Sequence, residues 1–299
     1  MLEKLKLVFN KLLRPFIPGT YEYLLRNKEH ILMNYTNKPR AKDVIIAMTT
    51  YGPRISFFEY AILSILNGTL LPEKMNIYVP QGFKKLLVQS NSFLKSVYDN
   101  GIVELIEMEV DYYCHSKYYY VFQAYSQEKD IVLCDDDVVY YKDWLSHLVH
   151  SAAEYPAFNV FAYKAVIVTT DNGAIRTYDD WIHCSKTDLG EHTQLYTEAV
   201  GGVFYRRGLF KTTVLDKELF LALVPKADDV WLWFCTWINQ GKVKFVLTKN
   251  NQKLQYIIPN SQEVALWKEN TFGKRNDGYV LACRSYFRDT YQMDIIDFL

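Results

Sequence analysis

Residues 131–140 read IVLCDDDVVY and set four apolar residues directly before three consecutive aspartates. Ile131 to Cys134 shows no polar alternation, which is typical of a short strand covered on both faces, as in a parallel sheet with helices above and below. Such sheets bind ligands at the carboxyl ends of their strands. Because the aspartates begin where this strand is expected to end, the sequence predicts a ligand site there.

The charge of the three aspartates needs an offset. Each has a reference pKa of about 3.9, so all are expected to be ionised at neutral pH, and a bound cation relieves their mutual repulsion. If the backbone stays extended, Asp135 and Asp137 share a side while Asp136 points elsewhere. Two converging carboxylates favour Mg²⁺ or Mn²⁺ over zinc. The alternative interpretation is an acidic loop, or an N-cap for a helix that starts near Lys142.

The segments around this stretch alternate between strand and helix patterns. Alternation of this kind indicates an α/β fold with a mostly parallel central sheet flanked by helices. In the first half, strands are predicted at 43–48, 75–79, 102–108 and 131–134, and helices at 21–35, 55–66, 82–98 and 116–126. The second half is more elaborate, with a long loop at 169–200, strands at 202–205 and 242–247, a helix at 228–239, and helices after Gln262 and Gly278.

Composition limits the class of protein. The chain has 299 residues, of which 49% are apolar and 23% charged, as expected of a globular protein. Lys plus Arg and Asp plus Glu are 34 each, so no overall field favours nucleic acid. The five cysteines lack paired spacing, which predicts reduced thiols in a cytoplasmic compartment. Zinc binding at Cys114–His115 or His183–Cys184 is disfavoured for the same reason.

The first 16 residues, MLEKLKLVFNKLLRPF, have helical spacing of leucine and phenylalanine with lysines and an arginine on the polar face. Two interpretations stay open: the helix packs on its own domain or a second copy, or it attaches reversibly to an anionic membrane surface. No apolar run approaches the roughly 18 residues that a membrane span needs. We therefore expect a helical extension over 1–40 and one domain over 41–299.

Four motifs occur in a fixed order: MTTYGPR at 48–54, DDD at 135–137, AVGGVFY at 199–205 and ADDVWLW at 227–233. The ordered set, over roughly residues 43–240, resembles the GT-A glycosyltransferases, and particularly bacterial enzymes that build surface polysaccharides such as capsule or lipopolysaccharide. The resemblance implies a Rossmann-like GT-A sheet. It also implies a nucleotide-binding half at about 41–140 and an acceptor-side half at about 141–299.

The resemblance assigns roles to the donor side. It implies that Asp135 and Asp137 hold Mn²⁺ or Mg²⁺ on the donor diphosphate, and that Asp135 also reaches the ribose. Gly201 and Gly202, which suit close backbone approach or positive φ, are expected beside the donor sugar and acceptor. The expected nucleotide-binding residues are Thr49, Thr50, Tyr51, Arg54, Lys117, Asp135 and Asp136. The alternatives are a simple tight turn at Gly52–Pro53 with a solvated Arg54, and a surface position for Lys117.

On the acceptor side, the resemblance implies that the pair Asp228 and Asp229 supplies the catalytic base, and Asp229 is the expected base. A helix N-terminus there is expected to favour the ionised carboxylate. An ordinary N-cap is the alternative. Trp231 and Trp233 are expected to stack on sugar or to belong to the core. The family often adds a histidine ligand near the carboxyl end, but the last histidine here is His192. Either Asp137 and the phosphates hold the metal alone, or another group such as Asp277 contributes.

Together these features predict a metal-dependent, inverting glycosyltransferase. Its donor is expected to be a nucleotide sugar, most simply a UDP-sugar, and its acceptor an oligosaccharide or lipid-linked glycan at the inner face of the cytoplasmic membrane. One alternative is a nucleotidyl- or phosphotransferase, for which a glycine-rich, lysine-bearing loop is expected in place of TTYGPR. The other is a non-catalytic glycan-binding protein.

Overall fold

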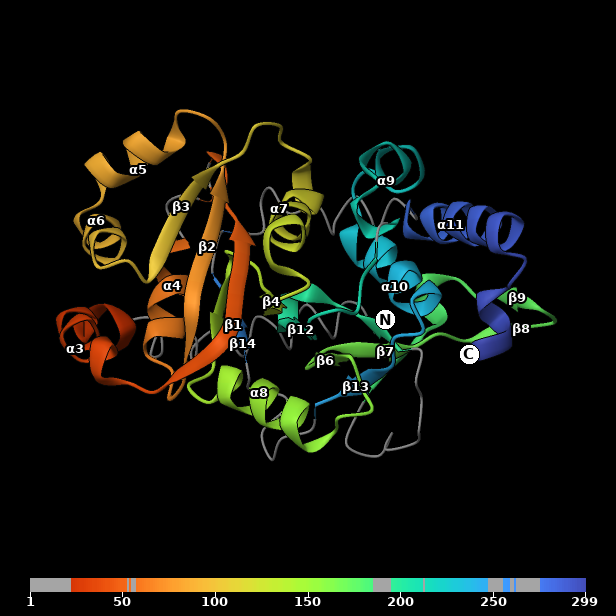
Figure 1. Ribbon diagram of the computed structural model, residues 1–299, viewed down its shortest axis with the longest axis horizontal. Coiled ribbons are helices and arrows are strands. Elements are labelled where there is room, and N and C mark those ends of the chain that lie inside the picture. Colours follow the sequence, from red (N-terminus) through yellow and green to blue (C-terminus); the bar gives the residue numbers. More distant parts are fainter. Residues whose placement is uncertain are drawn as a thin grey trace, which may run out of the picture.

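The computed structural model describes residues 23–52, 54, 58–184, 195–211, 213–246, 255–258, 261 and 275–299. The predicted amphipathic helix at 1–16, His192 and the helix predicted after Gln262 lie outside these residues. The centre of the molecule is a seven-stranded sheet of order β13-β6-β12-β4-β1-β2-β3 (Figure 1). Its strands are β1 (Arg40–Thr49), β2 (Leu71–Val79), β3 (Val103–Glu107), β4 (Asp130–Leu133), β6 (Val160–Ala162), β12 (Val203–Tyr205) and β13 (Val243–Phe245).

The sheet is mostly parallel, as predicted. β12 alone runs antiparallel to its neighbours β4 and β6, whereas the other neighbouring pairs are parallel. The chain builds β1, moves outward through β2 and β3, and returns on the other side of β1 as β4. The direction of winding therefore reverses between β1 and β4, and ligands of open α/β sheets bind at such a reversal.

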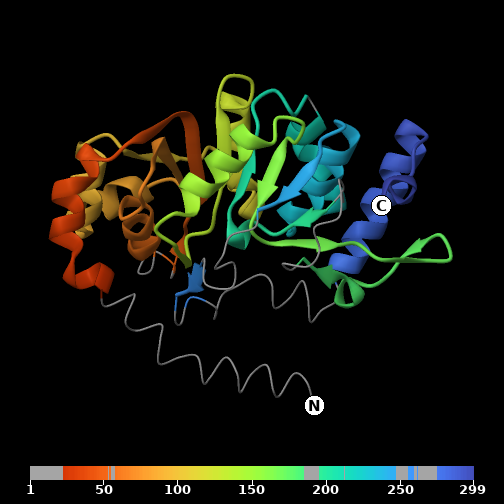
Figure 2. The same cartoon turned by 90° about the horizontal axis from the view of Figure 1, so that it is seen from below.

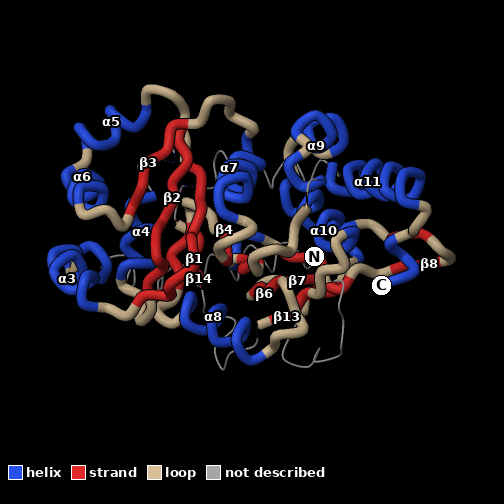
Figure 3. The backbone as a smooth tube through the Cα atoms, viewed as in Figure 1, coloured by secondary structure: helices blue, strands red, loops and turns tan. Residues whose placement is uncertain are grey.

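Helices cover both faces of the sheet (Figures 1 and 3). Val44, Ile46 and Met48 of β1 belong to the same hydrophobic core as α4 (Phe58–Leu66) and α8 (Trp144–Glu154). Ile45 and Ala47 belong to the core that includes α7 (Ser116–Tyr125) and α10 (Asp228–Ile238). Because apolar side chains are needed on both faces, central strands read as continuous apolar runs, which is why they were predictable.

The helix predicted at 82–98 is two helices, α5 (Phe83–Ser90) and α6 (Ser92–Asp99). Asn91 lies between them with extended backbone, and its side chain accepts a hydrogen bond from the Leu94 N–H at 3.1 Å. An asparagine in this position caps the second helix and ends the first. The helix predicted at 21–35 corresponds to a helical turn that ends before Asn27, followed by α3 (Lys28–Asn34) and η2 (Tyr35–Asn37). No helix in the described part of the chain is both long and apolar enough to cross a membrane.

The second half contains short strands that the sequence did not indicate. The predicted loop at 169–200 includes the hairpin β8 (Thr170–Asp171) and β9 (Ala174–Ile175), whose turn residues Asn172 and Gly173 both have positive φ. This hairpin projects beside α11 (Arg275–Tyr291), as Figures 1 and 2 show. A second sheet joins β7 (Ala165–Ile167) to β10 (Ile182–His183) and β11 (Tyr196–Thr197). Also unpredicted are β5 (Val138–Tyr140), its antiparallel partner β14 (Gln255–Ile257), and α9 (Lys217–Leu223).

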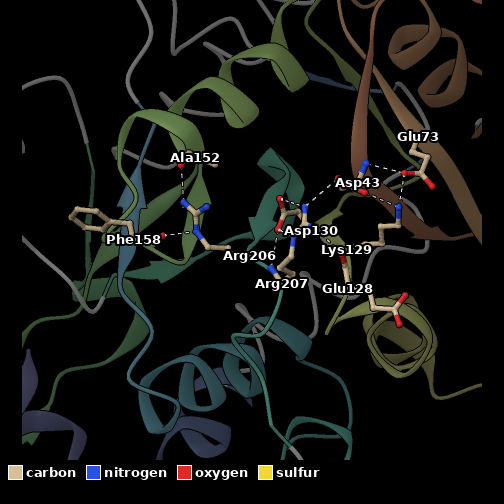
Figure 4. A network of polar contacts seen from close by, with 9 residues as sticks. All are labelled: Asp43, Glu73, Glu128, Lys129, Asp130, Ala152, Phe158, Arg206 and Arg207. Carbon is tan, nitrogen blue, oxygen red and sulfur yellow. Dashed lines mark hydrogen bonds and ion pairs between the residues drawn. The ribbon is translucent and has the colours of Figure 1, made fainter.

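Charged side chains occupy the amino edge of the sheet, where β1, β2 and β4 begin (Figure 4). Lys129 contacts Asp43 and Glu73, each at 2.8 Å, and Arg207 contacts Asp130 at 3.1 Å. Asp43 has φ 70° and lies between Ala41 and Ile45, where the pairing of β1 with β2 is irregular and β1 contains extra residues. Within the described residues, no cysteine forms a disulfide bond.

Candidate functional site at the carboxyl edge of the sheet

The register of the sheet brings the separate motifs to one edge. Ala47, Leu133, Val203 and Ala162 lie side by side across β1, β4, β12 and β6. Two residues beyond this row, toward the carboxyl ends of the parallel strands, are Thr49, Asp135, Gly201 and Lys164. TTYGPR, DDD and AVGGVFY therefore converge where the winding of the sheet reverses, as the sequence predicted for a ligand site.

The backbone turns at Asp136 and Asp137 instead of remaining extended. The predicted alternation, in which Asp136 points away from the other two, is therefore wrong. Asp136 and Asp137 both face Arg54: its Nη1 lies 2.8 Å from Asp136 Oδ1 and its Nη2 lies 3.2 Å from Asp137 Oδ2. The turn is fixed by Asp135 N–H, which donates to Tyr140 Oη at 2.8 Å, and by Ile258 N–H, which donates to the Asp137 carbonyl at 2.8 Å.

Arg54 is mostly buried, which excludes the solvated alternative. Its side chain is 16% exposed and its N–H donates to the Tyr51 carbonyl at 3.1 Å, which closes a tight turn. Gly52 in this turn has φ 48°. Of the predicted nucleotide contacts on this segment, Tyr51 is exposed, whereas Thr50 is buried and donates its N–H to the Tyr78 carbonyl at 3.2 Å. The turn thus aims Arg54 at the aspartates and leaves Tyr51 open to solvent.

Lys117 is buried between two carboxylates, so the surface alternative for it is wrong. Its Nζ lies 2.9 Å from Asp135 Oδ1 and 3.0 Å from Asp228 Oδ2, and its side chain is 8% exposed. A buried ammonium is stable only when such partners replace its hydration. Lys117, carried by α7, therefore ties the end of β4 to the start of α10.

The acidic pair at the start of α10 does not cap the helix. The N-cap residue is Ala227, and no side chain makes the capping hydrogen bond. Asp228 faces Lys117, and Asp229 Oδ1 accepts a hydrogen bond from Ala199 N–H at 3.2 Å. The capping part of that alternative is therefore wrong, although both aspartates do lie in the first turn of α10. Asp229 links α10 to the turn at Ala199.

The carboxyl pKa values at this edge shift in opposite directions, although burial acts to raise each of them. Burial raises the pKa of Asp229 well above its usual range, the charge of Asp228 adds to this shift, and Lys117 opposes it. The direction is opposite to the one predicted from the helix N-terminus alone. Burial also raises the pKa of Asp136 against the opposing charge of Arg54. For Asp135 burial also acts to raise the pKa, but Lys117, Arg54 and Lys164 together outweigh it and the pKa is lowered.

The glycine pair meets the predicted conditions of close approach and positive φ. Gly202 has φ 83°, and a Cβ there would lie 2.3 Å from the ring of Trp144. Trp144 Nε1 donates to the Gly201 carbonyl at 2.8 Å. A Cβ on Gly201 would lie 3.1 Å from Lys164 N. Gly202 is therefore required by a contact inside the protein, whereas a Cβ at residue 201 would need Lys164 to shift slightly.

Other predicted residues lie elsewhere. Trp231 and Trp233 are both buried in the core, which supports the core interpretation for each. Asp277 Oδ1 accepts a hydrogen bond from Tyr178 N–H at 2.7 Å. Three residues near Asp229 and Gly201 were not predicted, namely Lys164, Tyr178 and Glu198. The Tyr178 hydroxyl donates a hydrogen bond to Glu198 Oε1 at 2.9 Å. No spacing pattern marks them, because they reach this edge only through β6, β7 and the turn before β12.

The candidate ligands for a divalent cation at this edge are the carboxylates of Asp135 and Asp137. Among the described residues, no group of three or more His, Cys, Asp or Glu side chains is arranged to hold a metal ion. Asp135 and Asp137 offer hard carboxylate oxygens, and Mg²⁺ commonly binds one or two carboxylates together with substrate phosphates and water. Two aspartates at one strand end fit that pattern, provided that a phosphate-bearing ligand completes the coordination.

Comparisons with known proteins give likenesses of fold. No protein-family model and no curated protein matches the sequence. One similar solved structure is S. aureus TarS 1–349 in complex with UDP, which is 11% identical with a TM-score of 0.45 and covers 70% of this chain. This chain spans 58% of that one. Another is CMP:2-keto-3-deoxy-manno-octonic acid synthetase complexed with CTP, 13% identical with a TM-score of 0.39, covering 68% of this chain and 89% of that one.

Proposed function

We propose that this protein is a metal-dependent glycosyltransferase that moves a sugar from a nucleotide-sugar donor, a UDP-sugar, to a hydroxyl group of a glycan acceptor. The observation that supports this best is the position of Lys117 between Asp135 and Asp228. One residue thereby joins the predicted donor side, at the end of β4, to the predicted base side, at the start of α10. This junction lies at the β1–β4 reversal, where α/β sheets bind ligands.

The balance of charge supports a divalent cation at this edge. Five carboxylates, those of Asp135, Asp136, Asp137, Asp228 and Asp229, face two buried cations, Arg54 and Lys117, so the carboxylates are in excess by three. Burial is the main cause of the raised pKa values of Asp136 and Asp229, and a neighbouring carboxylate, Asp135 or Asp228 respectively, adds to each shift. In our proposal Asp135 and Asp137 hold Mn²⁺ or Mg²⁺, which supplies positive charge to the departing nucleoside diphosphate.

The residues of the chain have distinct tasks in this proposal. Asp229 accepts the proton of the acceptor hydroxyl, and a raised pKa makes its carboxylate a stronger base. Ala199 N–H orients the Asp229 carboxylate. Lys117 holds Asp228 and Asp135 in register, and Arg54 fixes the aspartate turn. In the proposed reaction the acceptor oxygen, as it loses its proton to Asp229, bonds to the anomeric carbon on the face opposite the bond to the nucleoside diphosphate, which breaks. The reaction is therefore a single displacement with inversion.

The test combines donor binding with product identity. The purified protein is screened by thermal shift against UDP-, GDP- and CMP-sugars, with and without Mn²⁺. A donor present at about 100 times its Kd stabilises the folded state by about 2.7 kcal/mol, and we expect this only when Mn²⁺ is present. Slow release of a nucleoside diphosphate supports sugar transfer. Release of pyrophosphate contradicts it and favours a nucleotidyltransferase.

The variant Asp137→Asn sharpens this test. It removes one proposed metal ligand while Arg54 keeps its contact with Asp136, so the fold is expected to survive. We expect loss of the Mn²⁺-dependent thermal shift and of donor turnover by about 100-fold or more. Asp43→Asn, at the amino edge of the sheet, is the matched control and is expected to retain both. Full activity of the Asp137→Asn variant would end the proposal.

A further inference from the structure

Lys164 occupies the carboxyl edge of the sheet in register with the aspartate turn. Lys164 lies two residues after Ala162, the last residue of β6, just as Asp135 lies two residues after Leu133, the last residue of β4. Val203 of β12 pairs with both Leu133 and Ala162, so the two strands run in the same direction with one strand between them. The register thus puts a lysine and the first aspartate on either side of the glycine pair that precedes Val203.

The backbone of Lys164 is fixed, although its side chain is exposed. Glu198 N–H donates to the Lys164 carbonyl at 3.0 Å. A Cβ on Gly201 would lie 3.1 Å from Lys164 N, 3.2 Å from its Cβ and 3.3 Å from its Cγ. The stem of the lysine therefore passes over Gly201, and the absence of a side chain at residue 201 leaves room for it. The exposed ammonium group extends from a rigid base.

The charges nearby distinguish Lys164 from the other two cations at this edge. Arg54 and Lys117 each contact two carboxylates. Within the described part of the chain, no carboxylate lies within 4.0 Å of the Lys164 ammonium. The strand register places Lys164 and Asp135 at the same edge of the sheet, with only β12 between their strands. Lys164 is thus a cation at the edge that holds the candidate metal ligands, and it makes no ion pair with a carboxylate of the described residues.

We propose that Lys164 binds the diphosphate of the nucleotide-sugar donor. This inference rests on the proposed function and assigns its phosphate contact to a residue outside the four sequence motifs. A lysine ammonium is a compact point charge that commonly binds phosphate. Lys117, the lysine expected there from sequence, already bridges two carboxylates, whereas Lys164 is exposed and keeps its charge for an anion from solution.

The experiment measures nucleotide affinity by isothermal titration in Mn²⁺. UDP, GDP and CDP, and the corresponding monophosphates, are titrated into the wild-type protein and into Lys164→Gln, Lys164→Arg and Lys211→Gln. Loss of one charged hydrogen bond predicts that the best nucleoside diphosphate binds Lys164→Gln about tenfold or more weakly. Lys164→Arg is expected to retain most of the affinity. Lys211 is also exposed, and Lys211→Gln is expected to match the wild-type protein.

The outcomes separate this inference from the proposed function. If the wild-type protein binds a nucleoside diphosphate and Lys164→Gln binds it equally well, the role of Lys164 is wrong while the proposed function stands. If Lys211→Gln weakens binding as much as Lys164→Gln does, only general surface charge is involved and the role is again wrong. If the wild-type protein binds none of the nucleotides, both proposals fall. An unchanged melting temperature of unliganded Lys164→Gln verifies that the variant is folded.

Discussion

Lys117 and Lys129 each bridge two carboxylates, at opposite edges of the same sheet. At the carboxyl edge, Lys117 lies 2.9 Å from Asp135 and 3.0 Å from Asp228, and its side chain is 8% exposed. At the amino edge, Lys129 lies 2.8 Å from both Asp43 and Glu73, and its side chain is 23% exposed (Figure 4). The contacts are alike, and the surroundings differ.

The pKa values express that difference. At the amino edge, hydrogen bonds from Lys129 lower the pKa of Asp43 and of Glu73, as expected of paired carboxylates near solvent. At the carboxyl edge, burial raises the pKa of Asp136 and Asp229 although cations are close. Carboxylates held away from their preferred ionisation state are a feature of functional sites. The difference in pKa shifts therefore favours the carboxyl edge as the candidate site and the amino edge as a structural ion-pair network.

The largest expected effect comes from Asp229→Asn, compared with Asp43→Asn. Loss of the proposed base is expected to lower the rate of sugar transfer by about 10²- to 10⁴-fold, whereas Asp43→Asn is expected to transfer at the wild-type rate. Both are measured as donor-dependent product formation with saturating Mn²⁺. Transfer by Asp229→Asn within about twofold of wild type would contradict the assignment of the base, since a general base contributes far more.

The same pair of variants has opposite expected effects on stability. The pKa of Asp229 is raised on folding, so the folded state binds the extra proton and wild-type stability falls as pH rises from 3.8 through the folded-state pKa. Asn does not titrate, so Asp229→Asn is expected to be the more stable protein above that window. The pKa of Asp43 is lowered, so its contribution is present at neutral pH and is lost as pH falls. Asp43→Asn is therefore expected to be less stable at neutral pH. Denaturant unfolding at several pH values checks both signs.

Lys117→Met and Lys129→Met test the two bridges directly. Removal of Lys117 leaves Asp135 and Asp228 without their buried partner, and breaking a buried pair costs about 3–5 kcal/mol of unfolding free energy. Lys129→Met leaves its carboxylates near water, so its loss is expected to be much smaller. Urea unfolding at neutral pH measures both. Equal losses would mean that burial does not distinguish the two edges.

Gly202→Ala and Gly208→Ala give the smallest expected effect, at the two ends of β12. Both glycines have positive φ, 83° and 74°. At Gly202 a Cβ also meets the Trp144 ring at 2.3 Å, whereas at Gly208 nothing lies within 4 Å. We expect about 2–4 kcal/mol of destabilisation for Gly202→Ala and about 1–2 kcal/mol for Gly208→Ala. Thermal unfolding measures the difference, and a ranking in the reverse order would contradict the role of Trp144.

Much of the fold was predictable because local patterns and burial agree in the first half. The strand at Ile131 and its neighbours are apolar on both faces, and the helices between them are long enough for periodicity. Where elements are two or three residues long, as in β8, β11 and β14, no period exists to detect. The break at Asn91 was missed because a single capping side chain, rather than hydrophobicity, divides the two helices.

For the candidate site, residue types were predictable and their partners were not. The motifs marked Arg54, Lys117, the three aspartates, the glycine pair and Asp229. That Arg54 faces Asp136 and Asp137, and that Lys117 joins Asp135 to Asp228, depends on residues 82 and 111 positions apart coming together. Lys164 carries no signal at all in the sequence, because only the register of β6 against β12 brings it to this edge.

The sequence by itself determined an α/β chain with a carboxylate-rich strand end and a second acidic pair, because apolar runs and charge are properties of neighbouring residues. Only the tertiary structure decided which basic side chain pairs with which carboxylate, and which carboxyl groups have a raised pKa. Those outcomes depend on burial and on strand register, and both arise from contacts between residues that are distant in the chain.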